Sequence, residues 1–482
     1  MPRRLPILIA AFSASLFAGC SGGASSENLS PQDFPVNTRP RETSADSDGG
    51  PTTPACPYFV SQRVCLTVTT PPTDESAIQD YIRKIALPLQ CDLSGKTVWG
   101  LAPLTDRFSD MRVFMLGEIH GSNEIGIVSS LVFEALAQSN QVNVVALEHP
   151  VDLEASIQHY INTGSDETFD KVLGGQAANQ FSVLLPRTAR KLVEKGASIR
   201  VVTLDIPYNP SVAADTLRAL AMKLSSQRAG TIAALPSSLS SPPTTEQLST
   251  VDAFFNTMNG KREALCSELS ASDCDAFFAW THALWASAHA DDGDQAGTDL
   301  WFSRREEFLY YNLRRGVLNP NDKMFAHMGS FHTNKYFGSA GSRLAREYGP
   351  TKDLVYSTAP AYEDGSVVWY GKDVPLPADP PVVASAFANS HPFPSYVPAT
   401  EANRDCVANP LGRETDLSVV GAGTRADLYD GYIFYGKLTP ETQPKAATLK
   451  RDDASLAARF SRFRERIVQR EGAAIAAIKS RR

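Results

Sequence analysis

A short apolar run that passes into a polar turn, Val113-Phe114-Met115-Leu116-Gly117-Glu118-Ile119-His120-Gly121, says most about how this chain folds. The apolar run predicts a buried strand. Gly117 permits a tight exit from that strand, and Gly121 permits a close approach of another backbone segment. Glu118 and His120 are two residues apart, so their side chains point the same way along an extended exit. A Glu/His pair on one side of the chain can hold a metal ion or polarise a water molecule.

Apolar runs alternate with helical patterns along the rest of the chain. The runs that predict strands are Val113–Leu116, Val142–Leu147, Ile199–Leu204, Lys323–Ala326, Leu354–Ser357, Val367–Tyr370 and Tyr432–Tyr435. The patterns that predict helices are Ile125–Ala137, Leu153–Ile161, Phe181–Glu194, Asp215–Leu224, Asp252–Met258, Cys274–Ala290 and Asp299–Arg315. We therefore expect an α/β fold, with a mostly parallel central sheet flanked by helices and a helical insertion at about residues 225–316.

Polar residues follow the predicted strands at the point where each strand ends. They are Glu118 and His120, Glu148 and His149, Asp205, and His327 with His332. Because ligands of open α/β sheets bind outside the carboxyl ends of the strands, we expect a functional site at this edge. The other four histidines, His159, His282, His289 and His391, fall in predicted helices or a late loop, where we expect surface or packed side chains.

The composition limits the classes of protein to which the chain can belong. It has 482 residues, 43% of them hydrophobic and 21% charged, which is ordinary for a globular protein with more than one domain. The net charge of -7 and the sequence pI near 5.7 argue against a nucleic-acid partner. No G-x-S-x-G nucleophile elbow is found beyond residue 23, and no P-loop or dinucleotide-binding glycine motif follows the first predicted strand.

The first twenty residues predict a lipoprotein signal peptide. Arg3 and Arg4 precede an apolar stretch that is too short to span a bilayer. The small residues before Cys20 resemble a bacterial lipobox, and an ordinary secretory signal is the alternative. We expect residues 1–19 to be removed and Cys20 to carry lipid such as palmitate. Ser21 follows Cys20 in place of a retention Asp, which favours an outer-membrane anchor with the body on the periplasmic or surface face.

Two segments flank the predicted α/β body, which spans residues 56–444. Residues 20–55 are rich in Ser, Pro, Gly, Thr and Asp and predict a flexible tether. Residues 445–482 predict a basic amphipathic helix, because apolar residues recur at helical spacing among many Lys and Arg. This helix either contacts an anionic membrane surface or docks on the body, and the sequence leaves both possibilities open.

Six further cysteines in an exported chain predict disulfide bonds. Proximity in the sequence favours the pairs Cys56–Cys65 and Cys266–Cys274, which leaves Cys91–Cys406. No pair has the spacing of a zinc site or of a redox motif.

Two motifs carry a resemblance to a known superfamily. Gly117-Glu118-Ile119-His120 together with Gly329-Ser330-Phe331-His332 resembles the paired motifs of the Tiki/TraB and ChaN haem-uptake superfamily. Further fragments resemble the erythromycin-esterase family of that superfamily: Gly121-Ser122-Asn123-Glu124, Val145-Ala146-Leu147-Glu148, Arg305-Glu306-Glu307-Phe308, Lys323-Met324-Phe325-Ala326-His327 and Tyr429-Asp430-Gly431-Tyr432-Ile433-Phe434. The matches run in order from about Arg112 to Leu438. This chain departs from the esterase pattern in having one residue, rather than two, between Glu118 and His120.

The esterase branch implies hydrolysis of an ester, lactone or amide by a water molecule that a histidine activates. The roles carried over are His120 as general base, Glu118 and Glu148 to orient it or bind the water, His327 or His332 to assist, and Arg305 to hold an anion or pair with a carboxylate. Glu124, His149 and Asp205 are further candidates for contacts with a small-molecule or peptide substrate. Glu124 stands in the first turn of the next predicted helix, whose N-terminus favours anionic groups.

The other branches of the superfamily imply a cofactor at the same place. In the Tiki-like branch, Glu118, His120 and His332 would be ligands of a divalent metal ion. A ChaN-like protein would bind haem without turnover, with Tyr310, Tyr311 and Tyr336 as candidate iron ligands. The sequence does not choose among these schemes, because they use many of the same residues.

Overall fold

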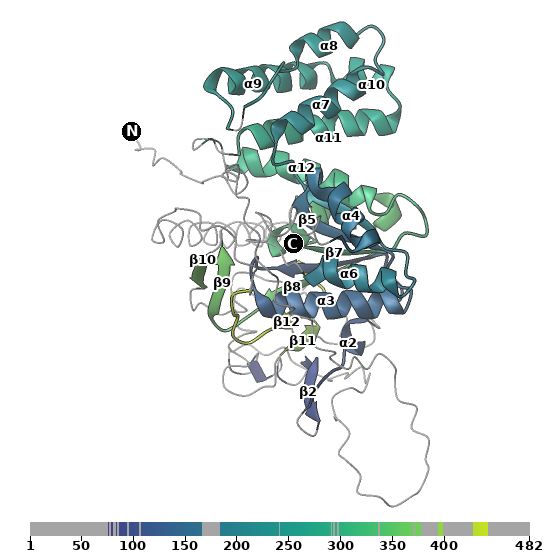
Figure 1. Cartoon of the computed structure of the whole chain (residues 1–482), viewed down its shortest axis with the longest axis vertical. Coiled ribbons are helices and arrows are strands. Elements are labelled where there is room, and N and C mark those ends of the chain that lie inside the picture. Colours follow the sequence, from purple (N-terminus) through teal and green to yellow (C-terminus); the bar gives the residue numbers. More distant parts are fainter. Residues whose placement is uncertain are drawn as a thin grey trace, which may run out of the picture.

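The computed structural model of the chain describes residues 86–165, 184–376, 394–398 and 428–441, with short gaps inside these ranges, and a few residues between 76 and 83 (Figure 1). The predicted signal peptide, tether and basic tail lie outside the described residues, as do Cys20, Cys56, Cys65, Tyr336 and Cys406. The predictions made for them, and the pairings Cys56–Cys65 and Cys91–Cys406, therefore stay predictions.

An eight-stranded sheet forms the centre of the body, in the order β1-β11-β12-β8-β4-β7-β5-β6. Its strands are β1 (Leu87–Pro88), β4 (Val113–Glu118), β5 (Val144–Pro150), β6 (Arg200–Asp205), β7 (Met324–Gly329), β8 (Val355–Ala361), β11 (Ser395–Pro398) and β12 (Gly431–Phe434). All neighbours from β12 to β6 are parallel, and only β11 and β1 at one edge pair antiparallel. The predicted α/β fold with a mostly parallel sheet is confirmed.

Alternate residues of the central strands face two separate cores. In β4, Phe114 and Leu116 pack under α3 (Asn123–Gln138), α4 (Glu154–Thr163) and α6 (Leu184–Glu194). Val113 and Met115 point to the other face, which α12 (Asp299–Arg315) and α14 (Ala340–Arg346) cover. Because both faces are covered, the strands are apolar along their length rather than alternating with polar residues.

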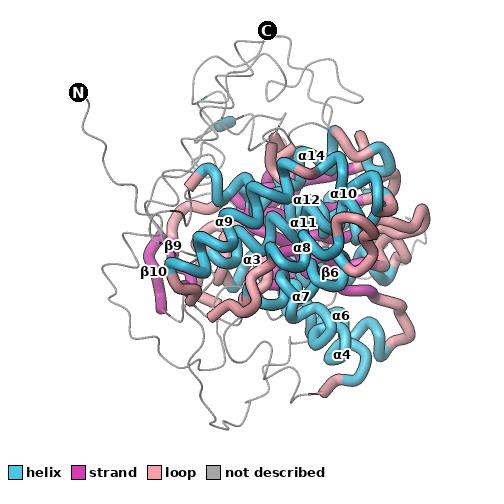
Figure 2. Tube along the Cα trace, turned by 90° about the horizontal axis from the view of Figure 1, so that it is seen from above, coloured by secondary structure: helices cyan, strands magenta, loops and turns pink. Residues whose placement is uncertain are grey.

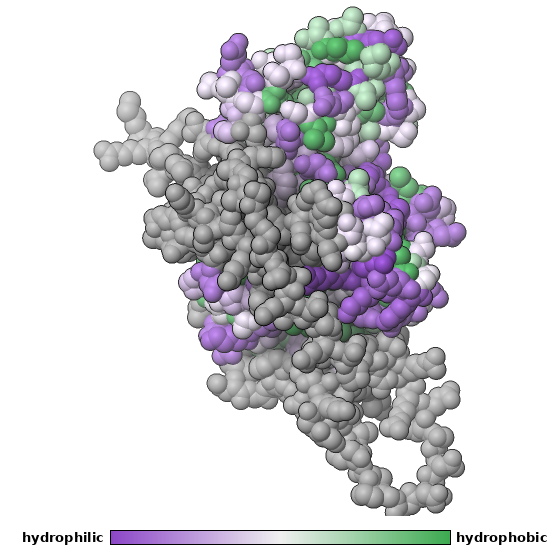
Figure 3. All heavy atoms as spheres, viewed as in Figure 1, coloured by the Kyte–Doolittle hydropathy of each residue, from purple (hydrophilic) through white to green (hydrophobic). Residues whose placement is uncertain are grey.

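A helical bundle lies beyond the sheet, at one end of the body (Figures 1 and 2). It consists of α7 (Pro210–Ala221), α8 (Arg228–Ala234), α9 (Thr245–Gly260), α10 (Arg262–Glu268) and α11 (Ala271–Ala288), which share an apolar core. Its visible face mixes hydrophilic and hydrophobic residues (Figure 3). The predicted insertion at about residues 225–316 overlaps this bundle, but α7 precedes that range and still packs on α11. The last helix in the range, α12, packs on β6 of the sheet.

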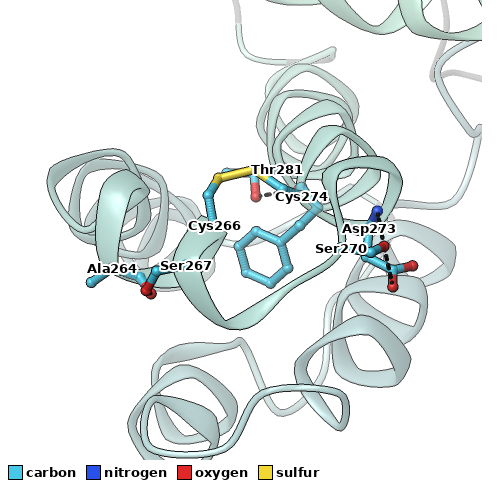
Figure 4. Close-up of a disulfide and its surroundings, with 8 residues drawn as sticks. Ala264, Cys266, Ser267, Ser270, Asp273, Cys274 and Thr281 are labelled. Atoms are coloured by element: carbon cyan, nitrogen blue, oxygen red, sulfur yellow. Dashed lines mark hydrogen bonds between the residues drawn. A yellow bond between two sulfur atoms is a disulfide. The ribbon is translucent and has the colours of Figure 1, made fainter.

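A disulfide bond between Cys266 and Cys274 joins α10 to α11 (Figure 4). This pairing confirms the one that proximity in the sequence predicted. The bond closes a loop of eight residues inside the bundle, where α10 is only seven residues long.

The remaining described elements are short. They are β2 (Gln90–Leu93), β3 (Lys96–Trp99), β9 (Gly365–Trp369), β10 (Lys372–Leu376), α2 (Ala102–Thr105), α13 (Ser330–Thr333) and the 3-10 turns Val151–Leu153 and Gly349–Thr351. β9 and β10 form a hairpin outside the main sheet, and Val368 donates its N–H to the carbonyl of Gly121. Among the described residues, no helix has the length and apolar character needed to cross a membrane.

Gly121 shows why a glycine follows the Glu118-Ile119-His120 turn. Its φ of +76° lies in the left-handed region, and a Cβ there would lie 1.9 Å from the carbonyl oxygen of Val368. The Glu118-Ile119-His120 turn and the β9–β10 hairpin therefore pack closely at Gly121.

Candidate active site

The carboxyl edge of the sheet brings the predicted residues together. The residues found there are Glu118 at the end of β4, Glu148 and His149 near the end of β5, Asp205 at the end of β6, and His332 in α13. His327 lies two residues inside β7 rather than at its end, because that strand runs on to Gly329. It is level with Leu116 of β4, so its side chain lies on the α3 face of the sheet.

Glu118 and His120 form the pair that their spacing predicts. The Nδ1 atom of His120 lies 2.8 Å from Oε1 of Glu118, and 17% of the His120 side chain is exposed against 4% of Glu118. Burial alone would lower the pKa of His120, but the charges of Glu118 and Glu148 outweigh it and raise the pKa to about 9. Burial opposes ionisation of Glu118, yet the neighbouring His327 and His120 hold its pKa below the usual value.

Glu148 is a buried carboxylate with two different partners. Its Oε2 accepts a hydrogen bond from the N–H of Gly329 at 2.6 Å, and its Oε1 accepts one from Nη2 of Arg305 at 2.5 Å. Burial would raise the pKa of Glu148, but His332, Arg305 and the Gly329 N–H lower it well below its ordinary value. Glu148 is therefore ionised and fixed in orientation.

A small gap separates His120 from Glu148. The Nε2 atom of His120 is 3.9 Å from Oε2 of Glu148, which is too far for a direct hydrogen bond. A methyl group on Gly329 would lie in this gap, 3.4 Å from Oε2 of Glu148 and 3.5 Å from Nε2 of His120. Oε2 of Glu148 and Nε2 of His120 therefore border the same place beside Gly329.

Arg305 of α12 ties three parts of the cluster together. Its Nε and Nη2 donate to the two oxygens of Asp205 at 2.7 and 2.8 Å, and its Nη1 contacts Nε2 of His332 at 2.9 Å. Burial opposes the charge of Arg305, but Asp205 and Glu148 raise its pKa. The resemblance implied that Arg305 holds a substrate anion or pairs with a carboxylate. The structure shows it paired with two carboxylates, those of Asp205 and Glu148.

Glu306 is a site residue that the sequence analysis missed. It accepts a hydrogen bond from Nδ1 of His332, while its second oxygen accepts the N–H of Ala340 at 2.6 Å. Because Arg305 can only donate, Nε2 of His332 must be an acceptor, which assigns the proton to Nδ1. The one available signal was position, since Glu306 directly follows Arg305 in the chain.

Further polar groups lie on the α3 face of the edge. Burial lowers the pKa of His149 to about 4, so that ring is neutral, and burial also lowers the pKa of His327. Nε2 of His327 lies 3.4 Å from Oε2 of Glu118 but forms no hydrogen bond within the described residues. The hydroxyl of Tyr435, another residue that the sequence analysis missed, is buried, and burial together with Glu118 raises its pKa.

Three of the predicted residues lie away from the cluster. Glu124, at the start of α3, accepts hydrogen bonds from the N–H and hydroxyl of Thr439 and thereby anchors the segment after β12. Tyr310 packs beneath the guanidinium of Arg343 at 4.0 Å, and Tyr311 stacks on Phe308. The partners of these three side chains therefore lie outside the cluster at the sheet edge.

Within the described residues, Glu118, His120 and Glu148 form the one group whose ligand atoms could hold a metal ion, all within 4.8 Å of one another. His332 is not part of that group, because its two ring nitrogens face Glu306 and Arg305. Two carboxylates and an imidazole suit a divalent cation.

Comparison with known proteins supports the fold rather than a specific activity. No protein-family model matches the sequence, and no curated protein matches it. A succinoglycan biosynthesis protein aligns at a TM-score of 0.52 and 12% identity, covering 78% of this chain and all of its own. A mutant of erythromycin esterase EreC in its open conformation aligns at 0.50 and 13%, covering 72% of this chain and 95% of its own.

The haem-binding ChaN of Campylobacter jejuni also aligns, over 56% of this chain and 88% of its own, at 12% identity. Its TM-score of 0.27 is too low to define a common fold. The chain therefore shares its α/β fold with the succinoglycan biosynthesis protein and with the erythromycin esterase, and the resemblance of its sequence motifs predicts the second of these likenesses.

Proposed function

We propose that this chain is an exported, lipid-anchored hydrolase in which Glu118, His120 and Glu148 activate a water molecule against an ester, lactone or amide. The observation that carries the proposal is the gap beside Gly329. A water molecule in that gap would meet Nε2 of His120 and Oε2 of Glu148 together. A positioned imidazole and a fixed carboxylate are the groups that general-base hydrolysis needs.

The chemistry follows from the hydrogen bonds of His120. Neutral His120 keeps its proton on Nδ1 and donates it in a hydrogen bond to Glu118, so the lone pair is on Nε2, which lies 3.9 Å from Oε2 of Glu148. The water oxygen attacks the carbonyl carbon of the substrate while Nε2 takes a water proton. Glu118 and Glu148 stabilise the imidazolium that results. His120 then returns the proton to the leaving oxygen or nitrogen, which restores the neutral ring.

Arg305 acts through Glu148 rather than on the substrate. Its guanidinium is buried and holds Asp205 as well as Glu148, so it fixes the carboxylate that faces the water. Glu306 fixes His332 in the same way, with its proton on Nδ1. We regard Arg305, Asp205 and Glu306 as positioning residues.

A metal-dependent form is the second candidate, favoured by the grouping of Glu118, His120 and Glu148. A divalent ion bound there would lower the pKa of its bound water, and these three side chains would hold it. Elemental analysis of the purified chain distinguishes the two forms. The metal-dependent form predicts near-stoichiometric metal in the wild type and its loss in Glu148→Gln.

The N-terminal sequence supports the proposed export and anchoring. The signal-like segment ends at Cys20, and the Cys266–Cys274 disulfide is typical of an oxidising compartment. Cells fed labelled palmitate should label the chain, and Cys20→Ala should abolish the label. An unlabelled wild-type chain would contradict the lipid anchor and leave the hydrolase proposal intact.

The hydrolase proposal is tested by a panel of esters, lactones and amides in ¹⁸O-labelled water. We expect turnover of at least one class, with one labelled oxygen in each acid product, because the attacking oxygen comes from solvent. A chain that turns over nothing in the panel while binding haem or metal stoichiometrically would favour a binding protein and contradict the proposal.

A further inference from the structure

A second cluster, away from the sheet edge, lies where three helices of the body meet. The guanidinium of Arg304, on α12, is placed between the rings of Phe255 from α9 and Trp285 from α11. Its central carbon is 3.7 Å from the centre of the Phe255 ring and 3.6 Å from that of Trp285. Arg304 precedes Arg305, whose side chain points instead to Asp205 and Glu148, so the two arginines serve different sides of α12.

Arg304 has no acidic partner in the part of the chain that the structure describes. Its Nη1 atom is buried and has no hydrogen-bond acceptor among the described residues. The other arginines of α12 and α14 that stack on rings are paired: Arg314 lies 2.6 Å from Asp275, and Arg343 lies 2.7 Å from Glu307. Stacking on two rings leaves the donors at the edge of the guanidinium in a fixed plane and ready for a ligand.

His282 of α11 supplies a second polar atom without a partner. Its ring stands edge-on to Phe255 at 5.2 Å, and its Nδ1 is buried without a hydrogen bond within the described residues. Burial lowers the pKa of His282 to about 4, so the ring is neutral and can present an N–H group. Buried polar atoms are nearly always satisfied in folded proteins, which points to a ligand at these two atoms.

The charges around His282 favour an anion. The groups that act on it are the cations Arg304, Arg262 and Arg343 and the single anion Glu307, which Arg343 neutralises. Asp252 acts on Arg304 but accepts the Nε1–H of Trp285 at 2.5 Å and forms no ion pair with the guanidinium. The balance around the two unpartnered atoms is therefore positive.

We propose that Arg304, held between Phe255 and Trp285, and His282, edge-on to Phe255, form a binding site for an oxyanion, either a carboxylate or a phosphate. A planar guanidinium donates two parallel hydrogen bonds to such a group, and the imidazole N–H supplies a third. The site is separate from the Glu118–His120–Glu148 cluster and does not depend on the proposed hydrolysis.

Isothermal titration calorimetry of the full-length chain tests the site, with inorganic phosphate and succinate as probes and chloride at equal ionic strength as the blank. We expect saturable binding of phosphate, of succinate or of both, and the stronger probe identifies the source of the oxyanion. Arg304→Gln should weaken that binding about tenfold or more, and Arg304→Lys should lose most of it, because an ammonium lacks the planar fork.

Arg314→Gln is the matched control, because Arg314 is also on α12 and stacks on Tyr310, but is already paired with Asp275. It should bind the probes as the wild type does. His282→Asn provides a second test if Arg304→Gln does not fold, which the thermal midpoint reports. No saturable binding by the wild type, or equal binding by wild type and Arg304→Gln, would overturn the proposal.

Discussion

Spacing in the sequence was sufficient to predict the Glu118–His120 pair, since two residues on an extended strand exit must share a side. The same argument could not find Glu306 or Tyr435. Glu306 is far from His332 in the chain and looks like one charge among many on α12, and its role appears only when α12 is laid on the sheet. Tyr435 follows an apolar strand and has the pattern of a core residue.

Gly329 is the residue whose replacement probes the gap most selectively. In Gly329→Ala the added methyl would lie against Oε2 of Glu148 and Nε2 of His120 and would crowd the proposed water, so kcat should fall about 100-fold or more while the substrate still binds. Because φ at Gly329 is -49°, alanine is not strained, and the free energy of unfolding should stay within about 1 kcal/mol of the wild type. Steady-state kinetics with a denaturation curve measures both.

Gly117→Ala is the matched control for that experiment. A Cβ at Gly117 would lie 2.8 Å from the carbonyl oxygen of Thr358 and would not enter the gap. We expect this variant to lose stability rather than to lose kcat selectively. Full activity in Gly329→Ala would mean that the gap is not the position of the attacking water.

The raised pKa of His120 predicts how the rate depends on pH. A general base must be deprotonated, and with a pKa of about 9 only about one His120 in a hundred is neutral at pH 7. In the metal-free form, kcat/KM should therefore rise with pH up to about 9 and level off above it. A rate that falls as pH rises from neutral to 9 would assign His120 the role of an acid.

At the scale of elements, the long strands and helices could be predicted and the short helices could not. The apolar runs of β4, β5, β6 and β7 are continuous because both faces of the sheet are covered. Helices α8 and α10 are seven residues each, too short for a clear helical period. The start of α7 at Pro210, with Asn209 as its cap, was also missed, since the prediction began at Asp215.

The Cys266–Cys274 disulfide should stabilise the helical bundle. The two cysteines are eight positions apart in the sequence. Replacing both by serine frees this loop in the unfolded chain, which should lower the free energy of unfolding by about 2–3 kcal/mol. We expect a lower thermal midpoint for the double variant and for the reduced wild type alike. Midpoints unchanged by both treatments would show that α10 and α11 hold together without the bond.

At the scale of the whole molecule, buried histidines predict an optimum of stability near pH 6.5. Burial lowers the pKa of His149 and His282 from 6.5 to about 4. Between pH 4 and pH 6.5 the unfolded chain therefore binds more protons than the folded chain. Stability is therefore lost as pH falls below 6.5, by up to about 3 kcal/mol for each group. His120 acts in the opposite sense: its contribution is complete below 6.5 and is lost as pH rises through about 9.

Thermal midpoints measured between pH 4.5, where carboxylates begin to protonate, and pH 9 check this optimum. The variant His282→Gln should lose part of the acid-side slope, and it leaves the sheet edge untouched. A midpoint that is flat between 4.5 and 6.5 would mean that these rings are protonated in the folded chain.

The central claim is that His120 activates water beside Glu148, and His120→Ala tests it most directly. The measurement is kcat/KM of wild type and variant on the best substrate of the ester, lactone and amide panel, with the thermal midpoint taken on the same samples. We predict a loss of about 1,000-fold or more in a folded variant, as expected when a general base is removed. A folded His120→Ala chain that keeps the wild-type rate would contradict the mechanism.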